Sequence, residues 1–226
     1  MKSAICRTRC TPRPAPTLFF FPGLSSRKIY EKNQFSNGSL LQPTHQQLRD
    51  IQTEYKKLRS SFDTDYTLQK DEHQLHSGKW DWNSFLLKGK IQQNFLETCP
   101  STVSYLENLR YHGHPSTNDG VGSIRLMTDT PFSFVFFSTL HRQTSIAPHY
   151  GPCNLRLRCH LPIFVPSDMD KEEAETMMMT TNKKVESEVG CGMKIGEEVV
   201  RWTEGIPLMF DDCYEHSVWN FTSSER

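Results

Sequence analysis

APHYGPCNLRLRCHLPI, residues 147–163, carries a basic side chain at every second position of a strand-like run. The basic residues are Arg156, Arg158 and His160, and the positions between them are leucine or cysteine. Successive side chains of a strand point to opposite faces, so the pattern predicts a strand with one apolar face and one basic face.

Two interpretations of this strand are open. It could be an antiparallel strand whose apolar face covers a core while its basic face lies in water. Alternatively, the basic face could line a pocket that holds an anion. The alternation alone does not separate them.

The composition limits what kind of protein the strand belongs to. The 226 residues are enough for one domain with a real core. The 26 basic and 26 acidic residues leave no net charge, and no basic stripe alternates with aromatic residues, so nucleic acid is not an expected partner. Seven cysteines without regular spacing predict neither a disulfide framework nor a zinc site.

The N-terminal part begins with a basic, proline-containing segment, residues 1–16, which predicts a disordered tail before one domain at 17–226. The apolar run at residues 18–21 is far shorter than the roughly 20 residues that cross a bilayer, so no membrane span is predicted. Apolar residues at helical spacing predict an amphipathic helix over residues 43–62.

A second helix is expected in residues 94–109, with Ser101 or Thr102 as its N-cap. After it the pattern changes to strands, which we expect at 122–128 and 131–140. Strands continue to the end of the chain, interrupted by a charged, Met-rich segment at 167–189 that predicts a surface insertion.

Helices followed by short antiparallel strands predict an α+β fold whose β half is a sandwich or a barrel.

Two histidines flank the basic strand and are candidate metal ligands. His149 stands in PHYG just before it, and His216 stands in FDDCYEHSVWN. A single histidine is more often structural, but two imidazoles beside a cationic pocket suit Fe(II) and a dicarboxylate co-substrate.

Three acidic residues precede His216. For Asp211 and Asp212 we expect hydrogen bonds to backbone before a turn, rather than contact with a metal. Glu215 should point to the opposite face from His216.

The segments FSTLHRQTSIAPHYGPCNLRLRCHLPI and WTEGIPLMFDDCYEHSVWN resemble the aspartyl/asparaginyl β-hydroxylase family of Fe(II)- and 2-oxoglutarate-dependent oxygenases. The resemblance is clearest over 137–164 and 190–226, and weaker at 19–24 and 78–87. It implies a double-stranded β-helix, a cupin-like jelly-roll barrel with N-terminal helices packed on one side.

The resemblance also implies roles for particular residues. His149 and His216 match the two iron-binding histidines. Gly151 stands where most such oxygenases have a carboxylate, as is characteristic of this family. The remaining matches are to family positions that bind 2-oxoglutarate: Ser138, Arg158 and His160, with Arg226 on the distal carboxylate, where a planar guanidinium can contact both oxygens.

The chemistry implied by the resemblance consumes 2-oxoglutarate and O₂, releases succinate and CO₂, and hydroxylates a C–H bond. In this family the usual target is the β-carbon of Asp or Asn in EGF-like domains of protein substrates, while bacterial relatives act on lipid acyl chains. Animal members are typically anchored in the endoplasmic reticulum membrane. We therefore expect that location if the full-length protein carries the anchor, and a soluble protein otherwise.

Two departures from the family pattern qualify these expectations. The 167–189 insertion is absent from the pattern, and the chain stops at Arg226, where the family continues into another strand. We therefore expect the barrel to lack its last strand and Arg226 to fray. The alternative to an active oxygenase is a non-catalytic, cupin-like binding protein or an inactive truncated homologue.

Overall fold

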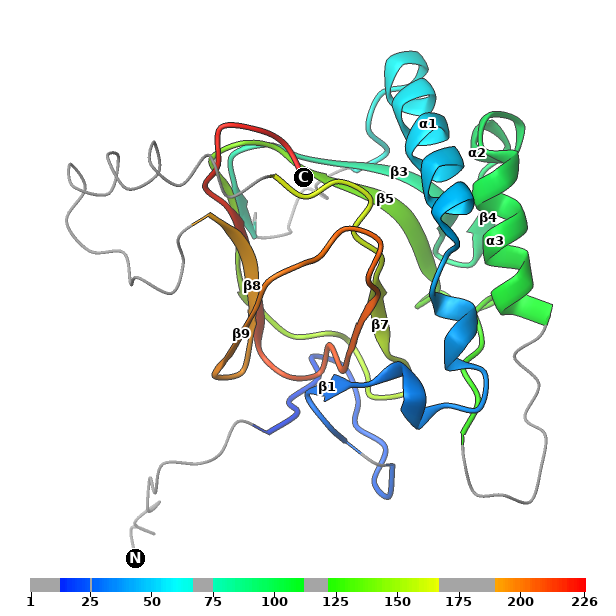
Figure 1. Ribbon diagram of the computed structural model, residues 1–226. Coiled ribbons are helices and arrows are strands. Elements are labelled where there is room, and N and C mark those ends of the chain that lie inside the picture. The colour runs from blue at the N-terminus through cyan, green and yellow to red at the C-terminus, as the bar shows by residue number, and fades with distance from the viewer. Residues whose placement is uncertain (1–12, 25, 67–74, 112–121, 167–189) are drawn as a thin grey trace, which may run out of the picture.

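The computed structural model describes residues 13–24, 26–66, 75–111, 122–166 and 190–226 (Figure 1). The predicted insertion at 167–189 and residues 1–12 of the predicted tail lie outside these ranges. Of the tail's remaining residues, Ala15 donates its backbone N–H to the carbonyl of Cys213 at 2.7 Å.

The described residues combine three α-helices with short antiparallel strands, as the α+β prediction requires. The helices are α1 His45–Ser61, α2 Gln93–Thr98 and α3 Pro100–Tyr111, preceded by the 3-10 helices η1 Lys32–Gln34 and η2 Gly38–Leu41. The strands are β1 Ile29–Tyr30, β2 His76–Ser77, β3 Trp80–Leu87, β4 Lys90–Ile91, β5 Phe134–Leu140, β6 Thr144–His149, β7 Arg158–His160, β8 Cys191–Ile195, β9 Glu198–Val200, β10 Leu208–Phe210 and β11 His216–Asn220.

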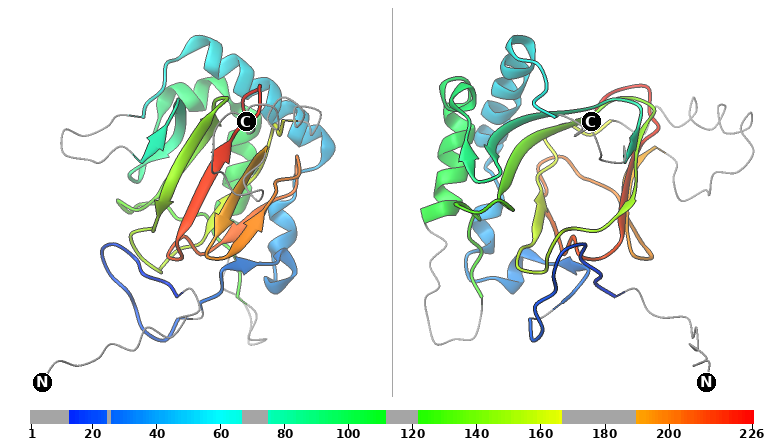
Figure 2. Two further views of the ribbon diagram at one scale, coloured as in Figure 1. Left: turned by 90° about the vertical axis from the view of Figure 1, so that its left-hand side faces the viewer. Right: turned by 180° about the vertical axis from the view of Figure 1, so that it is seen from behind.

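The strands form three antiparallel sheets with the orders β1-β10-β7, β2-β6-β11-β8-β9 and β4-β3-β5. The helices lie together on the outer side of the β3–β5 sheet, and the other two sheets lie on its opposite side (Figures 1 and 2). Strand pairing within the described ranges does not close the three sheets into one barrel. The arrangement is thus mixed helix and antiparallel sheet, with the helices on one side as expected.

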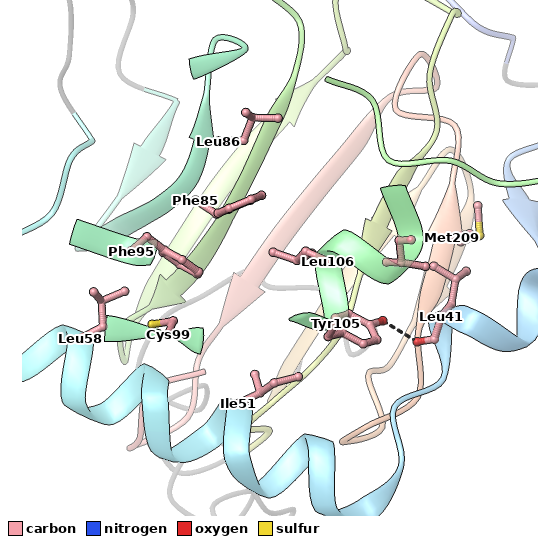
Figure 3. Packing of buried hydrophobic residues seen from close by; sticks show 11 residues of the cluster. Leu41, Ile51, Leu58, Phe85, Leu86, Phe95, Cys99, Tyr105, Leu106 and Met209 are labelled. Atoms are coloured by element: carbon pink, nitrogen blue, oxygen red, sulfur yellow. Dashed lines mark hydrogen bonds between the residues drawn. The ribbon is translucent and has the colours of Figure 1, made fainter. Parts of the chain in front are cut away.

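The predicted amphipathic helix at 43–62 is confirmed as α1. Thr44 caps it through a capping box, because its hydroxyl accepts from the Gln47 N–H while the Gln47 side chain accepts from the Thr44 N–H. Ile51 and Leu58 are buried in the core between the helices and the β3–β5 sheet (Figure 3). In the same core the hydroxyl of Tyr105 donates to the carbonyl of Leu41 at 2.8 Å.

The helical segment predicted at 94–109 is divided into two helices, α2 and α3, and the predicted N-caps are wrong. Helix α3 begins at Pro100, a residue that suits the first helical position because it has no N–H to leave unpaired. The N–H groups of Ser101 and Thr102 donate to the carboxylate of Glu54 at 2.7 and 2.8 Å. A buried carboxylate from α1 therefore caps α3 in place of a local hydroxyl.

The strand predicted at 131–140 is confirmed as β5. One of its faces carries Phe137, which packs against Tyr55 of α1 and Phe95 of α2. The other face carries Phe136, which stacks on Trp82 of β3 with ring centroids 4.2 Å apart. This second face looks away from the helices, toward the other two sheets.

The prediction of a strand at 122–128 is wrong, because this segment pairs with no sheet. The N–H of Ile124 donates to the side chain of Asn37 at 2.7 Å, and the N–H of Leu126 donates to the carbonyl of Leu109 at 3.4 Å. Its backbone groups thus find partners on a loop and on the end of α3.

Candidate active site

His149 and His216 lie side by side at the paired ends of β6 and β11. The two residues are partners in the antiparallel register, and their ring centroids are 4.1 Å apart. Nδ1 of His149 lies 2.8 Å from the carbonyl of Ala147, and Nδ1 of His216 lies 2.9 Å from that of Tyr214. A carbonyl only accepts, so each Nδ1 carries the proton and each neutral ring keeps its lone pair on Nε2.

The surroundings keep both rings neutral. Burial, together with the neighbouring His149, lowers the pKa of His216 to about 4. Burial also lowers the pKa of His149, and the charge of Arg158 adds to this effect. Two neutral imidazoles, each held by its Nδ1–H, are suited to binding a divalent transition metal.

The carboxylate of Asp212 binds two arginines of the basic strand and acts electrostatically on the histidine pair. It accepts from Arg156 at 2.8 Å and from Arg158 at 3.3 Å, and it is fully buried. Burial opposes its charge, but the charges of Arg158 and Arg156 prevail and hold the pKa of Asp212 below its usual value. Arg156 and Arg158 therefore share a face of the chain, as the alternation predicted.

The basic face does not lie in water. The side chain of Arg156 is 10% exposed, and its other donor bonds the carbonyl of Phe132 at 2.5 Å. On the opposite face, Leu157 and Leu161 pack against the core beneath the helices. The interpretation of the strand as half solvated is therefore wrong.

Gly151, two residues after His149, is closely packed against Asp212. A Cβ at this position would overlap the carboxylate carbon and Oδ1 of Asp212. Glycine is thus required here because the buried carboxylate occupies the space that a side chain would take.

The expectation for the acidic residues before His216 is correct for Asp211 and wrong for Asp212. Asp211 accepts from the N–H of Cys213 at 2.9 Å, which is the expected turn contact, and also from the hydroxyl of the distant Ser26 at 3.1 Å. Asp212 instead binds two guanidinium groups from the basic strand. Glu215 is exposed and accepts from the hydroxyl of Tyr150 at 3.0 Å, as its predicted orientation away from His216 requires.

Asp211, Asp212 and Cys213 also lie close enough together to resemble a metal site. Both oxygens of Asp211 accept hydrogen bonds, and Oδ2 of Asp212 binds the arginines, whereas Oδ1 of Asp212 has no hydrogen-bond partner among the described residues. Burial, with the nearby Asp211, raises the pKa of the Cys213 thiol, so it stays protonated. With Asp211 engaged and the Cys213 thiol protonated, the cluster does not offer a complete set of free metal ligands.

A row of ring contacts leads from the histidine pair to Arg226. Phe210 contacts His216 at 5.4 Å and His160 at 5.0 Å between centroids. His160 lies 6.1 Å from Trp202, and the guanidinium carbon of Arg226 lies 3.4 Å from the centroid of the Trp202 ring. Residues from β7, β10, β11 and the C-terminal segment thus meet in one place.

The far end of this row carries the cationic Arg226 and buried nitrogen atoms that lack hydrogen-bond partners within the described ranges. In the described part of the chain, the buried Nε of Arg226 and Nδ1 of His160 have no hydrogen-bond partner. Burial lowers the pKa of Arg226 to about 10, and burial with the charge of Arg226 lowers that of His160 well below its usual value. Buried donors without partners indicate a place where an anion would be stabilised.

The expectation that Arg226 frays is wrong. Its N–H donates to the carbonyl of Leu140 at 2.9 Å, and its carbonyl accepts from the N–H of Leu140 at 2.7 Å. The neighbouring Glu225 is ion-paired with Arg59 of α1. Backbone pairing and stacking on Trp202 therefore fix Arg226 in place.

Ser138 lies on β5, two residues before Leu140 and on the same face of that strand. It is exposed, and its hydroxyl accepts from Nε1 of Trp80 at 2.8 Å. The structure thus places Ser138 on the strand that holds the Arg226 backbone, while the other predicted site residues come from the neighbouring sheets.

Sequence reasoning did not find Trp202 or Phe210, which connect the two ends of the site. Both lie in the segment WTEGIPLMFDDCYEHSVWN, but neither is a type of residue that ligates a metal or binds an anion. The only available signal was their position in the segment 190–226 that precedes and contains His216.

Comparisons with known proteins identify the family of the chain. Residues 45–226 match the family described as aspartyl/asparaginyl beta-hydroxylase. The aspartyl/asparaginyl beta-hydroxylase of Mus musculus is 28% identical over 159 residues, which are 70% of this chain and 17% of that protein. Aspartate beta-hydroxylase domain-containing protein 2 of the same species is 26% identical over 213 residues, 93% of this chain and 50% of that protein.

A bacterial relative, the ornithine lipid ester-linked acyl 2-hydroxylase of Rhizobium tropici, is 26% identical over 148 residues, 64% of this chain and 38% of that protein. The chain thus spans half or less of the length of these relatives. Among the helices of the described ranges, none is both long enough and apolar enough to cross a membrane. The match over residues 45–226 places the chain in the aspartyl/asparaginyl beta-hydroxylase family.

Proposed function

We propose that this chain is an Fe(II)- and 2-oxoglutarate-dependent hydroxylase domain, and that its three sheets correspond to the double-stranded β-helix of such oxygenases. The observation that carries the proposal is the distribution of groups along the site. Two neutral histidines stand at one end, and at the other stand the cationic Arg226 and the neutral His160, each with a buried nitrogen that has no hydrogen-bond partner in the part of the chain that the structure describes.

His149 and His216 would hold the iron. Their Nδ1–H groups are fixed on backbone carbonyls, which leaves Nε2 of each ring available as a ligand. The Asp212 carboxylate is engaged by Arg156 and Arg158, and the adjacent Gly151 provides no ligand. The two histidines are therefore the protein ligands that we propose.

Arg226 would bind the distal carboxylate of 2-oxoglutarate, with His160 beside it. A dicarboxylate would supply the acceptors that these buried groups lack, and the planar guanidinium can bind both oxygens of one carboxylate. We propose Arg158 and Ser138 as further contacts. The Trp202 ring supports the Arg226 guanidinium from one face, so the arginine is already in position before the anion arrives.

The bound iron, with 2-oxoglutarate and O₂, would supply the oxidising power for hydroxylation. The chain's own residues would bind and orient the co-substrate and keep water away from it through Phe210 and Trp202, both of which are buried. The substrate that we propose is the β-carbon of Asp or Asn in a protein, such as an EGF-like domain. Membership in a family named for this reaction supports that choice.

Anaerobic calorimetric titrations with Fe(II) and then 2-oxoglutarate test the two halves of the site separately. His149→Ala and His216→Ala should each abolish stoichiometric Fe(II) binding, whereas His45→Ala, at the exposed start of α1, should not. Arg226→Ala should weaken 2-oxoglutarate binding by on the order of 2–5 kcal/mol, because a charge-assisted pair is lost. The exposed Arg142→Ala is the matched control.

Unchanged Fe(II) affinity in both histidine variants would disprove the iron site. If Arg226→Ala and Arg142→Ala bound 2-oxoglutarate equally well, the assignment of Arg226 would be wrong.

A further inference from the structure

The segment Thr17–Leu24, TLFFFPGL, is an apolar loop fixed beside the histidine end of the site. The N–H of Thr17 donates to the carbonyl of Gly151 at 3.0 Å, and that of Leu18 donates to the carbonyl of Pro152 at 3.1 Å. Farther along, Phe21 and Asn154 exchange two hydrogen bonds of 2.8 Å. The loop therefore runs alongside the residues that directly follow His149.

One side chain of the loop packs inward and most of the others lie in water. Phe19 packs edge-on against Phe132, with centroids 5.4 Å apart. By contrast, large apolar side chains on and beside the loop are strongly exposed: Leu18 66%, Phe20 49%, Phe21 45%, Leu24 47% and Leu155 47%. Exposed apolar clusters of this kind mark surfaces that bind a partner or a membrane.

The loop also projects from the body of the molecule. In Figures 1 and 2 the dark-blue segment extends below the strands, away from the helices. Its turn at Gly23 has φ +86°, and a Cβ there would meet no atom within 4 Å. A projecting apolar turn can enter a soft apolar phase without any rearrangement of the sheets.

The charges of the residues around the loop indicate what kind of surface the loop binds. Residues 1–30 contain no acidic residue and six basic ones: Lys2, Arg7, Arg9, Arg13, Arg27 and Lys28. Of those that the structure describes, Arg13 and Arg27 are exposed, and Lys28 pairs with Glu198. A groove on a protein partner could bind the apolar side chains, but such binding would not require the basic residues beside them.

An anionic bilayer accommodates both features, because apolar side chains enter the acyl layer while basic residues bind lipid phosphates. We infer that residues Leu18–Leu24 dock the protein on an anionic lipid surface. Because the loop is bonded to residues 151–154, docking brings the His149 end of the site close to the bilayer. The inference does not depend on the proposed oxygenase chemistry.

Co-sedimentation of the metal-free chain with lipid vesicles tests it. The wild type should bind vesicles of phosphatidylcholine mixed with phosphatidylserine, and bind pure phosphatidylcholine vesicles more weakly. Leu18→Ser/Phe20→Ser should reduce the affinity for the mixed vesicles by about tenfold or more, since two inserted side chains are lost. Arg13→Gln/Arg27→Gln should reduce it by several-fold, and added salt should remove this difference.

The matched control is Ile91→Ser/Ile206→Ser, which changes two similarly exposed apolar residues, 43% and 51%, outside the loop. It should bind the mixed vesicles like the wild type. If the Leu18→Ser/Phe20→Ser variant were misfolded by circular dichroism, Leu24→Ser alone would replace it. A wild-type protein that stays in the supernatant, that binds both kinds of vesicle equally, or that is weakened equally by the loop and control substitutions would overturn the inference.

Discussion

Gly151 lies so close to the buried carboxylate of Asp212 that the space for a side chain at position 151 is already occupied. The two residues are also joined through the backbone, because the Gly151 N–H donates to the Asp212 carbonyl at 2.5 Å. The absence of a carboxylate at position 151 is therefore coupled to the presence of one at position 212, which is ion-paired with two arginines.

Gly151→Ala should therefore destabilise the protein, because the new methyl group displaces Asp212 from Arg156 and Arg158. Overpacking of this kind costs about 1–3 kcal/mol. Thermal unfolding should show a fall in Tm of about 2–4 °C for each kcal/mol lost. Gly122→Ala is the control, because a Cβ there meets no atom within 4 Å. Equal Tm values for the two variants would show that the contact between Gly151 and Asp212 is not tight.

Glu54→Ala should destabilise α3 although the substitution is in α1. The change removes the acceptor for the N–H groups of Ser101 and Thr102 and for the Thr102 hydroxyl. Leaving such donors unpaired costs about 1–3 kcal/mol, which denaturant unfolding can measure. Glu107→Ala, which removes only the surface contact with Arg110, should change the free energy of unfolding by less than about 0.5 kcal/mol. Similar losses in the two variants would contradict this cap.

Glu225→Ala should weaken 2-oxoglutarate binding with little effect on Fe(II) binding. Glu225 is held by Arg59 of α1 and lies 3.7 Å from Nδ1 of His141, so it fixes the backbone next to Arg226. The pair is partly exposed and worth about 0.2–1 kcal/mol, which corresponds to at most about a fivefold change in affinity. Glu197→Ala, an exposed residue paired with Lys194, is the control. An unchanged 2-oxoglutarate affinity would mean that Arg226 is positioned by Leu140 and Trp202 alone.

His216 should remain neutral at pH 6 in the metal-free protein. Burial lowers its pKa to about 4, whereas an unfolded histidine has a value near 6.5. Between these values the unfolded chain binds more protons, so the free energy of unfolding should fall as the pH falls from about 6.5 to about 4. NMR titration of the His216 ring should give a midpoint near 4. A midpoint near 6.5 would contradict the burial of this ring.

Local patterns in the sequence predicted α1, β5 and the shared face of Arg156 and Arg158, because each depends on the periodicity of one segment. Contacts between distant residues could not be predicted in this way. Glu54 caps a helix that begins at Pro100, and Asp212 binds an arginine 56 residues earlier. The sequence carries no local signal for either pairing.

The prediction that Arg226 frays is wrong for the same reason, a contact with a distant residue. A terminal residue with nothing after it suggests fraying, but the partner that fixes its backbone is Leu140, far earlier in the chain. The segment at 122–128 was mistaken for a strand because its composition is strand-like, whereas its backbone partners are Asn37 and Leu109. In both cases the structure of the segment depends on its burial and on backbone partners elsewhere in the chain. The pattern of a single segment does not show these partners.

We propose that the histidine pair and the buried cationic end form one catalytic site for Fe(II) and 2-oxoglutarate. Conversion of 2-oxoglutarate to succinate, measured with and without Fe(II), tests it most directly. We expect iron-dependent succinate formation by the wild type, its loss in His216→Ala, and a raised KM for 2-oxoglutarate in Arg226→Ala. A wild-type protein that binds Fe(II) and 2-oxoglutarate but forms no succinate, with or without a protein substrate bearing EGF-like domains, would contradict it and identify a non-catalytic binding protein.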